Sequence, residues 1–293
     1  MPQLQSAATL AEIQRLDANR LAHHQSLSVD DARGDVRVLL CHTLAKSKAW
    51  LLAHERDPMA DLGLDTSAYA QAFERRMAGE PVAYILGRRE FHGLDFEVTP
   101  AVLIPRPETE LLVDTALRLL PPGQSTRILD LGTGSGCIAI AIAARLGHAT
   151  VLATDQSSAA LEVAMRNRNR LGATNVTFRH SNWFSDLGNE SFDLIVSNPP
   201  YVDGNDPHLR QGDLRFEPIG ALTPGEDGMS ALSQIARGAP LHMRSQGWLL
   251  MEHGRNQGST LQRELESLGY EAIEALHDMA GHWRSTLARR PLV

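Results

Sequence analysis

The stretch Arg127-Ile-Leu-Asp-Leu-Gly-Thr-Gly-Ser-Gly136 decides the fold of this chain of 293 residues. A short apolar strand, Arg127–Leu131, runs into three glycines and then into an apolar segment, for which we expect a helix over 138–146. Glycine has no Cβ, so the loop Gly132–Gly136 can turn tightly and bring its backbone close to a ligand. The third glycine comes one residue earlier than in the Gly-x-Gly-x-x-Gly fingerprint, which disfavours a pyrophosphate site.

Strands and helices alternate from about residue 126 onward. We expect strands over 127–131, 151–154, 192–197 and 247–252, helices over 138–146, 159–171 and 256–268, and terminal strands near 270–276 and 282–288. Such alternation builds an α/β fold with a doubly wound, mostly parallel sheet. Ligands of these sheets bind beyond the carboxyl ends of the strands, so residues that follow strands are the candidates for a site.

Two more segments follow strands of this sheet. Asp155 ends the second strand, roughly 20 residues after the glycine loop, where a carboxylate can accept hydrogen bonds from ribose hydroxyls. Asn182-Trp183-Phe184 follows the third strand, and we expect Trp183 beside an adenine and Phe184 in the core. The alternative is a tight turn with a surface Asp and core aromatics. Together these features predict a site for S-adenosyl-L-methionine, held by Gly132, Thr133, Gly134, Ser135, Gly136, Asp155 and Trp183.

Asn198-Pro-Pro-Tyr201 follows the strand 192–197 and has the clearest chemistry. The nitrogen of an amide or an exocyclic amine is a poor nucleophile, because its lone pair is delocalised. A site that accepts both N–H hydrogens can hold such a nitrogen in line with a sulfonium methyl group. The Asn198 side-chain carbonyl can accept one hydrogen, and the Pro199 backbone carbonyl, fixed by two prolines, can accept the other.

Tyr201 can pack against the planar substrate. The motif therefore predicts methyl transfer to a planar nitrogen, with Asn198, Pro199 and Tyr201 as catalytic residues that act through orientation and electrostatic match. A plain Pro-Pro turn is the alternative. The position of the motif, downstream of the glycine loop and Asp155, favours the chemical role.

The chain before the sheet divides into two parts. Residues 1–81 show helical spacing, and Ser28 with Asp31 resembles a capping box, so we expect a small helical domain that recognises a partner or covers a site. Residues 82–106 carry alternating apolar positions and turns at Gly93 and Pro100, which predict a β-hairpin linker. Pro107 suits the first turn of a helix. Residues 107–293 then form the methyltransferase domain.

Composition and charge argue against several classes of protein, although a local basic groove is compatible with them. A net charge of −7 disfavours a protein that coats nucleic acid, and no apolar run approaches the roughly 20 residues of a membrane span. Cys41 and Cys137 lack metal-ligand spacing and His23-His24 reads as solvated, so we expect reduced thiols and no metal. The first residues lack the apolar region of a signal peptide. We expect a cytoplasmic protein that works as a monomer, without direct nucleic acid.

These motifs closely resemble those of the bacterial peptide chain release factor glutamine methyltransferase family, over nearly the whole chain. The resemblance is carried by Tyr84-Ile-Leu-Gly-Arg-Arg-Glu-Phe91, Leu103-Ile-Pro-Arg-Pro-Glu-Thr-Glu110, Asp130–Gly136, Asn182-Trp183-Phe184, Asn198–Tyr201, Gln211-Gly-Asp-Leu-Arg-Phe-Glu-Pro218 and Glu252-His-Gly254. It implies a class I methyltransferase fold, a helical domain that engages the release factor, and methylation of the glutamine in the Gly-Gly-Gln motif of class I release factors.

The resemblance also implies roles for single residues. Asn198 would touch both cofactor and substrate, and Asn198, Pro199, Pro200 and Tyr201 would clamp the glutamine amide. Arg106 would line the same pocket, with an ion pair to a helix-start carboxylate as the alternative. Asn182 stands where the family pattern leads us to expect Asp, and its amide can still hydrogen-bond adenine. We expect His253 to be structural, because this chemistry needs no strong base.

Three rival functions remain open at this point. One is a related glutamine methyltransferase of a ribosomal protein, which the Arg-Pro-Glu-Thr-Glu110 form of the linker disfavours. Another is an adenine-N-methyltransferase of nucleic acid, which would need a basic target-recognition domain. The third is a non-catalytic adenosyl-binding partner, which would not need the Asn198–Tyr201 motif.

Overall fold

The computed structural model describes residues 8–121, 123–225 and 227–290. The chain forms two compact units. The first contains the chain up to Gly87 together with Gln211–Phe216, and the second contains Arg88–Arg210 and the chain from Glu217 onward. Each unit has its own hydrophobic core. We refer to the first as the helical unit and to the second, which contains the residues predicted to be catalytic, as the catalytic unit.

The helical unit is built from five α-helices of the described chain: α1 (Leu10–Gln25), α2 (Val29–Thr43), α3 (Lys48–Ala53), α4 (Ser67–Met77) and α5 (Val82–Leu86). Thr9 caps α1 in a capping box with Glu12. As predicted, Ser28 caps α2 by accepting the Asp31 N–H. All five helices contribute to one core, for example through Leu10, Val36, Leu51, Phe73 and Ile85.

The hairpin is shorter than predicted. Val82–Leu86 form the helix α5, and the hairpin consists of β1 (Arg88–Phe91) and β2 (Leu94–Glu97). A short apolar run suits a strand or a helix equally well, and the flanking residues decide here. Pro81 precedes the first turn, and Gly87 ends the helix in the left-handed conformation.

The catalytic unit contains a seven-stranded sheet in the order β5-β4-β3-β6-β7-β9-β8. Its strands are β3 (Arg127–Leu131), β4 (Thr150–Asp155), β5 (Val176–His180), β6 (Phe192–Ser197), β7 (Met243–Glu252), β8 (Glu271–His277) and β9 (Trp283–Arg289). Strand β9 runs antiparallel to both of its neighbours, and the pairs from β5 to β7 are parallel. The predicted doubly wound, mostly parallel sheet is confirmed.

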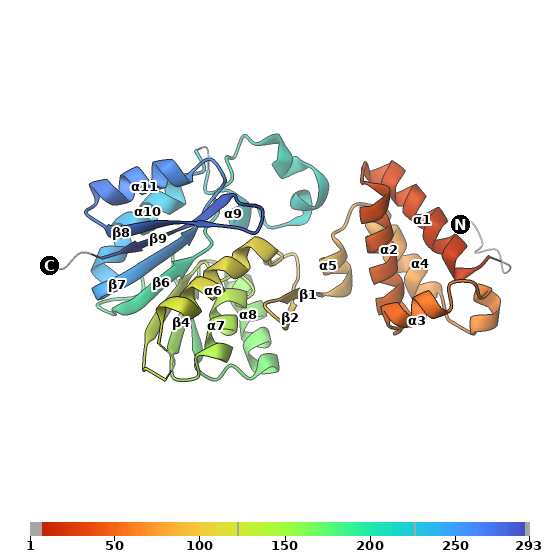
Figure 1. Ribbon diagram of the computed structural model, residues 1–293, viewed down its shortest axis with the longest axis horizontal. Helices are drawn as coiled ribbons and strands as arrows, with labels where there is room; N and C mark the ends of the chain where they lie inside the picture. The colour runs from red at the N-terminus through yellow and green to blue at the C-terminus, as the bar shows by residue number, and fades with distance from the viewer. Residues whose placement is uncertain (1–7, 122, 226, 291–293) are drawn as a thin grey trace. The chain divides into compact units, whose positions relative to one another are not determined.

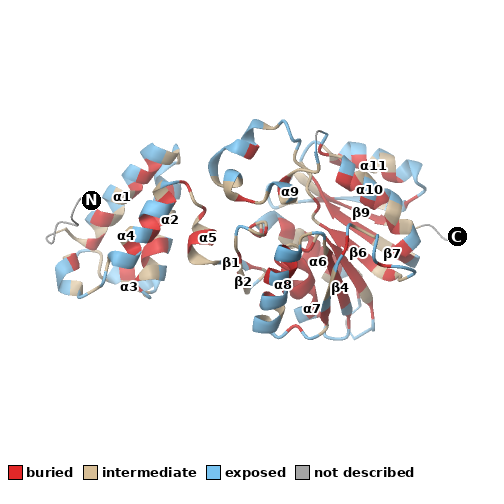
Figure 2. Cartoon of the chain, turned by 180° about the vertical axis from the view of Figure 1, so that it is seen from behind, coloured by how far each residue is buried: buried red, intermediate tan, exposed pale blue. Residues whose placement is uncertain are grey.

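Helices cover both faces of this sheet (Figures 1 and 2). One face carries α6 (Glu110–Leu119), α7 (Cys137–Arg145) and α8 (Ser158–Leu171), and the other carries α10 (Ser230–Gly238) and α11 (Gly258–Ser267). Alternate strand residues enter opposite cores. Ile128 packs with α6 and α7, whereas Leu129 packs with α10 and α11. No helix within the described ranges is long and apolar enough to cross a lipid bilayer.

Arg76 is a buried cation of the helical unit. It is 4% exposed, and its Nε donates to Asp35 Oδ2 at 2.8 Å while its Nη1 donates to Asp213 Oδ1 at 2.9 Å. Nη1 also reaches the carbonyl of Glu80 at 3.2 Å. Because Asp213 belongs to Gln211–Phe216, this cluster attaches that short segment to the helices.

Replacement of Arg76 by Ala should therefore destabilise the helical unit. The change leaves the partly buried Asp35 without its cation, and we expect a loss of about 3 kcal/mol in the free energy of unfolding. Its neighbour Arg75 provides the matched control. Arg75 is 48% exposed on its side chain and pairs with Glu80, so Arg75→Ala should cost less than about 1 kcal/mol. Urea unfolding followed by circular dichroism measures both, and equal losses would contradict this account.

Candidate active site

The strands of the catalytic unit end in matched register at one edge of the sheet. Leu131 of β3 is paired with Ser197 of β6 on one side and with Thr154 of β4 on the other. The Ser197 hydroxyl donates to the Leu131 carbonyl at 2.8 Å, which ties the ends of β3 and β6 together. The next residues along each strand are Gly132, Asn198 and Asp155, so the predicted site residues leave the sheet side by side.

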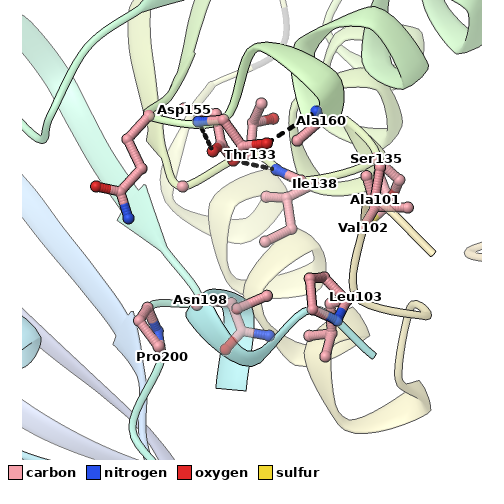
Figure 3. Close-up of a pocket in the computed structure, with 18 of the residues that line it drawn as sticks. Ala101, Val102, Leu103, Thr133, Ser135, Ile138, Asp155, Ala160, Asn198 and Pro200 are labelled. Carbon is pink, nitrogen blue, oxygen red and sulfur yellow. Dashed lines mark hydrogen bonds between the residues drawn. The ribbon is translucent and has the colours of Figure 1, made fainter. Parts of the chain in front are cut away.

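A cavity lies beyond this edge, with the glycine loop and Asp155 at one end and Asn198 and Pro200 at the other (Figure 3). Of the residues predicted for the site, those that line it are Gly132, Thr133, Gly134, Ser135, Asp155, Trp183, Asn198, Pro200 and Arg106. Gly136, Pro199 and Tyr201 are not among the lining residues. In the described part of the chain, no group of three or more His, Cys, Asp or Glu side chains could hold a metal ion.

The Asp155 carboxylate holds the glycine loop in place. Its Oδ2 accepts the Gly134 N–H at 2.9 Å, and its Oδ1 accepts the Ser157 N–H at 2.8 Å. A carboxylate oxygen can accept more than one hydrogen bond, so Asp155 can also accept from a ligand hydroxyl. Gly134 has a φ of +56°, and a Cβ there would meet only open space, so its backbone is open to a ligand. Burial raises the pKa of Asp155 above its ordinary value.

Gly136 has a packing role. A Cβ at this position would lie 3.0 Å from Ile140 Cδ1 and 3.2 Å from the Cβ of Ala164, so a side chain would push α7 and α8 apart. Its φ of +81° also favours glycine. The third glycine of the loop therefore serves helix packing, while the first two line the cavity.

Trp183 has an unusual backbone conformation beside the glycine loop. Its φ is +50°, in the left-handed region that few non-glycine residues adopt. The Ser181 hydroxyl donates to the Trp183 carbonyl at 2.9 Å and supports this conformation. The indole lies against Gly132, where a Cβ would be 3.6 Å from the ring. Phe184 packs against the core as expected and stacks on His242 with a centroid distance of 5.0 Å.

Arg106 lines the cavity and pairs with Glu217 rather than with a carboxylate at the start of the following helix. The Glu217 side chain is wholly buried, and its Oε2 also accepts the Ile104 N–H at 3.0 Å. Pro218 follows directly and lines the cavity too. One buried carboxylate therefore joins two walls of the cavity that are far apart in the sequence.

Hydrogen bonds from both ends of the Asn198–Tyr201 motif reach the protein around it. The Asn198 Nδ2 donates to Thr109 Oγ1 at 3.1 Å. The Tyr201 hydroxyl donates to Glu252 Oε1 at 3.0 Å. Gln257 donates from Nε2 to the Tyr201 carbonyl at 2.9 Å and so fixes the backbone after the two prolines.

His253 is buried behind this network. Its Nδ1 is hydrogen-bonded to the Gly254 carbonyl at 3.0 Å, and its Nε2 is hydrogen-bonded to Thr286 Oγ1 at 2.9 Å. Burial lowers the pKa of His253, which favours the neutral imidazole. Both ring nitrogens are engaged within the protein, and this supports the structural role expected from the sequence.

Three further residues of the site were quoted within the segments that carry the family resemblance but were assigned no role from the sequence: Thr109, Glu217 and Glu252. Glu252 ends an apolar strand at the same sheet edge as Asp155, so the signal that identified Asp155 applies to Glu252 as well. Glu217 lies 111 residues from Arg106 along the chain, and Thr109 lies 89 residues from Asn198. No local pattern reveals contacts of that separation.

Glu252 predicts a characteristic pH dependence of stability. Burial raises the pKa of Glu252 from 4.5 to about 7. Between these values the folded protein binds the proton more tightly than the unfolded chain, so this residue destabilises the fold progressively as the pH rises. The variant Glu252→Gln does not titrate here. The free energy of unfolding of this variant, taken relative to that of the wild type, should therefore increase by up to roughly 3 kcal/mol as the pH rises from about 4.5 to 7.

Urea unfolding of both proteins across this interval and at about pH 8 measures the gap. Other buried carboxyl groups, such as Asp130, are common to both proteins and cancel in the difference. A gap that stays constant from about pH 5 to pH 8 would contradict the raised pKa of Glu252.

Comparison with known proteins agrees with this geometry. Residues 12–87 match the model of the PrmC N-terminal domain, and residues 107–213 match the methyltransferase small domain. A methyltransferase structure from Pyrococcus furiosus has the same fold, with a TM-score of 0.53 at 21% identity over 76% of this chain and 100% of that one.

Curated relatives cover most of the chain. The release factor glutamine methyltransferase of Xylella fastidiosa (strain Temecula1) is 48% identical over 259 residues, which is 88% of this chain and 94% of that protein. The Bordetella pertussis (strain Tohama I) protein of the same name is 49% identical over 250 residues, which is 85% of this chain and 92% of that protein. Identity of this degree over both lengths shows that the chain belongs to the release factor glutamine methyltransferase family.

Proposed function

We propose that this protein methylates the side-chain amide nitrogen of the glutamine in the Gly-Gly-Gln motif of class I peptide chain release factors, with S-adenosyl-L-methionine as methyl donor. Membership of the family supports the substrate. The observation that carries the proposal is the position of Asn198. Its side chain lines the cavity at the end of β6, beside the glycine loop that follows β3. A fixed amide at that point suits the capture of another amide.

The residues around the glycine loop suit the adenosyl cofactor. Gly132–Ser135 expose backbone to the cavity, Asp155 has lone pairs for the ribose hydroxyls, and Trp183 provides an aromatic surface for the adenine. Asn182 also lines the cavity and can hydrogen-bond the adenine with its amide. S-adenosylmethionine supplies an electrophilic methyl group on a sulfonium centre.

The acceptor side uses orientation instead of a strong base. In our proposal the substrate amide donates one N–H to the Asn198 side-chain carbonyl and the other to the Pro199 backbone carbonyl. Pro199 and Pro200 restrict that backbone, and the Tyr201 ring packs beside the planar amide. Arg106, already paired with Glu217, supports the wall of the cavity. These residues hold the nitrogen in place and exclude water from it.

The rest of the molecule fits the same proposal. The helical unit would recognise the release factor, as the match to the PrmC N-terminal domain suggests. The catalytic unit supplies the residues that line the cavity, and we propose that the protein works as a monomer. The free thiols Cys41 and Cys137 suit the reducing cytoplasm, and the net charge of −7 disfavours nucleic acid as a ligand.

The proposal predicts the outcome of a transfer assay. Radiolabelled S-adenosylmethionine is incubated with the protein and one of four acceptors: a release factor, its Gln→Ala variant in the Gly-Gly-Gln motif, a ribosomal protein, or free nucleic acid. We expect label on the unaltered release factor alone. Label that persists on the Gln→Ala variant would show that this glutamine is not the methyl acceptor. Label on the ribosomal protein or nucleic acid would reassign the substrate, and no label with cofactor still bound would indicate a non-catalytic partner.

Two single variants should separate catalysis from cofactor binding. Asn198→Ala removes one acceptor of the substrate amide, so turnover should fall at least about 100-fold while cofactor affinity changes little. Asp155→Asn presents a donor to the Gly134 N–H and loses the charge, so cofactor affinity should fall roughly 10- to 100-fold. Calorimetry measures binding and the transfer assay measures turnover. Near-normal turnover of Asn198→Ala would be incompatible with the proposed clamp.

A further inference from the structure

Gln257 is a half-buried residue whose side-chain amide joins three loops of the catalytic unit. Its Nε2 donates to the Tyr201 carbonyl at 2.9 Å and to the Gly228 carbonyl at 3.1 Å. Its Oε1 accepts the Gly254 N–H at 2.7 Å. Each of these partners is a backbone group, which can act only as a donor or only as an acceptor. The two ends of the Gln257 amide are therefore distinguished without ambiguity.

Two glycines leave the room that this amide needs. A Cβ on Gly228 would lie 2.7 Å from the Tyr201 carbonyl oxygen and 3.0 Å from Gln257 Nε2. A Cβ on Gly254 would lie 3.0 Å from Gln257 Oε1. Gly228 also has a φ of +63°, which favours glycine. The backbone of the three loops is thus packed closely around one side chain.

The core of the catalytic unit holds the backbone of Gln257. This residue directly precedes α11, and its carbonyl accepts the Leu261 N–H at 2.9 Å. Leu261 and Leu265 of α11 are fully buried in the core that also contains residues of α10 and β7. The amide therefore extends from a fixed base, and a substitution that alters only its end leaves the packing of α11 in place.

The Asn198–Tyr201 motif depends on contacts at its two ends. Its two prolines have no N–H to donate, and each fixes φ, so the remaining freedom of the backbone lies in ψ. The direction of the Pro199 carbonyl is therefore set by where the flanking residues are held. Strand β6 holds the first end in the sheet as far as Ser197. Gln257 holds the other end by its hydrogen bond to the Tyr201 carbonyl.

We propose that Gln257 is a positioning residue for methyl transfer: it holds the Tyr201 carbonyl and thereby fixes the direction in which Pro199 presents its carbonyl to the substrate amide. This inference rests on the proposed function for the identity of the acceptor. Gln257, Gly228 and Gly254 are not among the residues that line the cavity. The role of Gln257 is therefore exerted through the motif, without contact to the cofactor or to the reacting atoms.

Gln257→Glu tests this role, because it keeps the shape of the side chain and removes both donors. A carboxylate oxygen would repel the carbonyls of Tyr201 and Gly228, so the motif should lose its fixed end. We expect kcat for the release factor to fall about 10- to 100-fold. KM for the factor and the affinity for S-adenosylmethionine should each change less than about 3-fold. Gln262→Glu is the matched control, because it adds the same charge to α11 at a surface glutamine that bonds Glu266.

Gln257→Met separates the loss of the hydrogen bonds from the added charge. Methionine has a similar length and no N–H to donate, so we expect kcat to fall by the same order as in Gln257→Glu. Thermal unfolding of both variants and of the control shows that the proteins compared are folded. Wild-type kcat in either folded variant would overturn the positioning role. Cofactor affinity that falls as far as kcat would overturn it too, because such a loss indicates general damage to the site.

A spectroscopic readout separates this inference from the proposed function. Of the four tyrosines of the chain, only Tyr201 is followed by valine. The full chain labelled with carbon-13 in the tyrosine carbonyls and nitrogen-15 in valine therefore gives one correlated signal, that of Tyr201 and Val202. Gln257→Glu and Gln257→Met should both shift its carbonyl carbon, and Gln262→Glu should not. If the wild-type protein fails to methylate the release factor, the proposed function fails, and this signal alone then decides whether Gln257 holds the motif. An unchanged signal in both variants would overturn that role.

Discussion

The paired ends of β3 and β6 are the constraint on which the site depends. Leu131 and Ser197 stand opposite each other in adjacent parallel strands, and the Ser197 hydroxyl closes the pair by donating to the Leu131 carbonyl. A slip of one residue would move one loop by about 3.3 Å along the sheet and turn every following side chain to the other face. The glycine loop and Asn198 can therefore serve one cavity only while this register holds. The alternating apolar residues of both strands enforce it by filling two separate cores.

Buried carboxylates also hold the loops at this edge of the sheet through hydrogen bonds and an ion pair. Asp155 accepts backbone N–H groups of the glycine loop, Glu217 holds Arg106 and the Ile104 N–H, and Glu252 accepts the Tyr201 hydroxyl. Burial of a charged group costs free energy unless hydrogen bonds compensate it. Asp155 and Glu217 each accept from two donors, which offsets part of the cost of desolvation, whereas Glu252 keeps a buried oxygen, Oε2, without a partner in the described part of the chain.

The parts of the fold that could be predicted from the sequence are those governed by local pattern. The strands β3 and β6, the glycine loop and the helix start at Pro107 follow from apolar periodicity and from the restricted backbones of glycine and proline. Val82–Leu86 was predicted wrongly, because an apolar run of five residues does not distinguish strand from helix. The Arg106–Glu217 and Thr109–Asn198 contacts join segments remote in sequence, and only the folded sheet edge brings them together. Sequence reasoning thus identified several of the residues that line the cavity and assigned no role to Glu217 and Thr109, which contact two of them.

The segment between Tyr201 and Glu217 links the two units by chain connectivity. It leaves the catalytic unit after Arg210, joins the helical unit over Gln211–Phe216, and returns at Glu217, the buried partner of Arg106. In the helical unit it is held by Arg76 through Asp213. Removal of residues 1–87 would therefore take away Arg76, the partner of Asp213. The contribution of the helical unit to substrate recognition is better tested by substitutions on its surface that leave Arg76 in place.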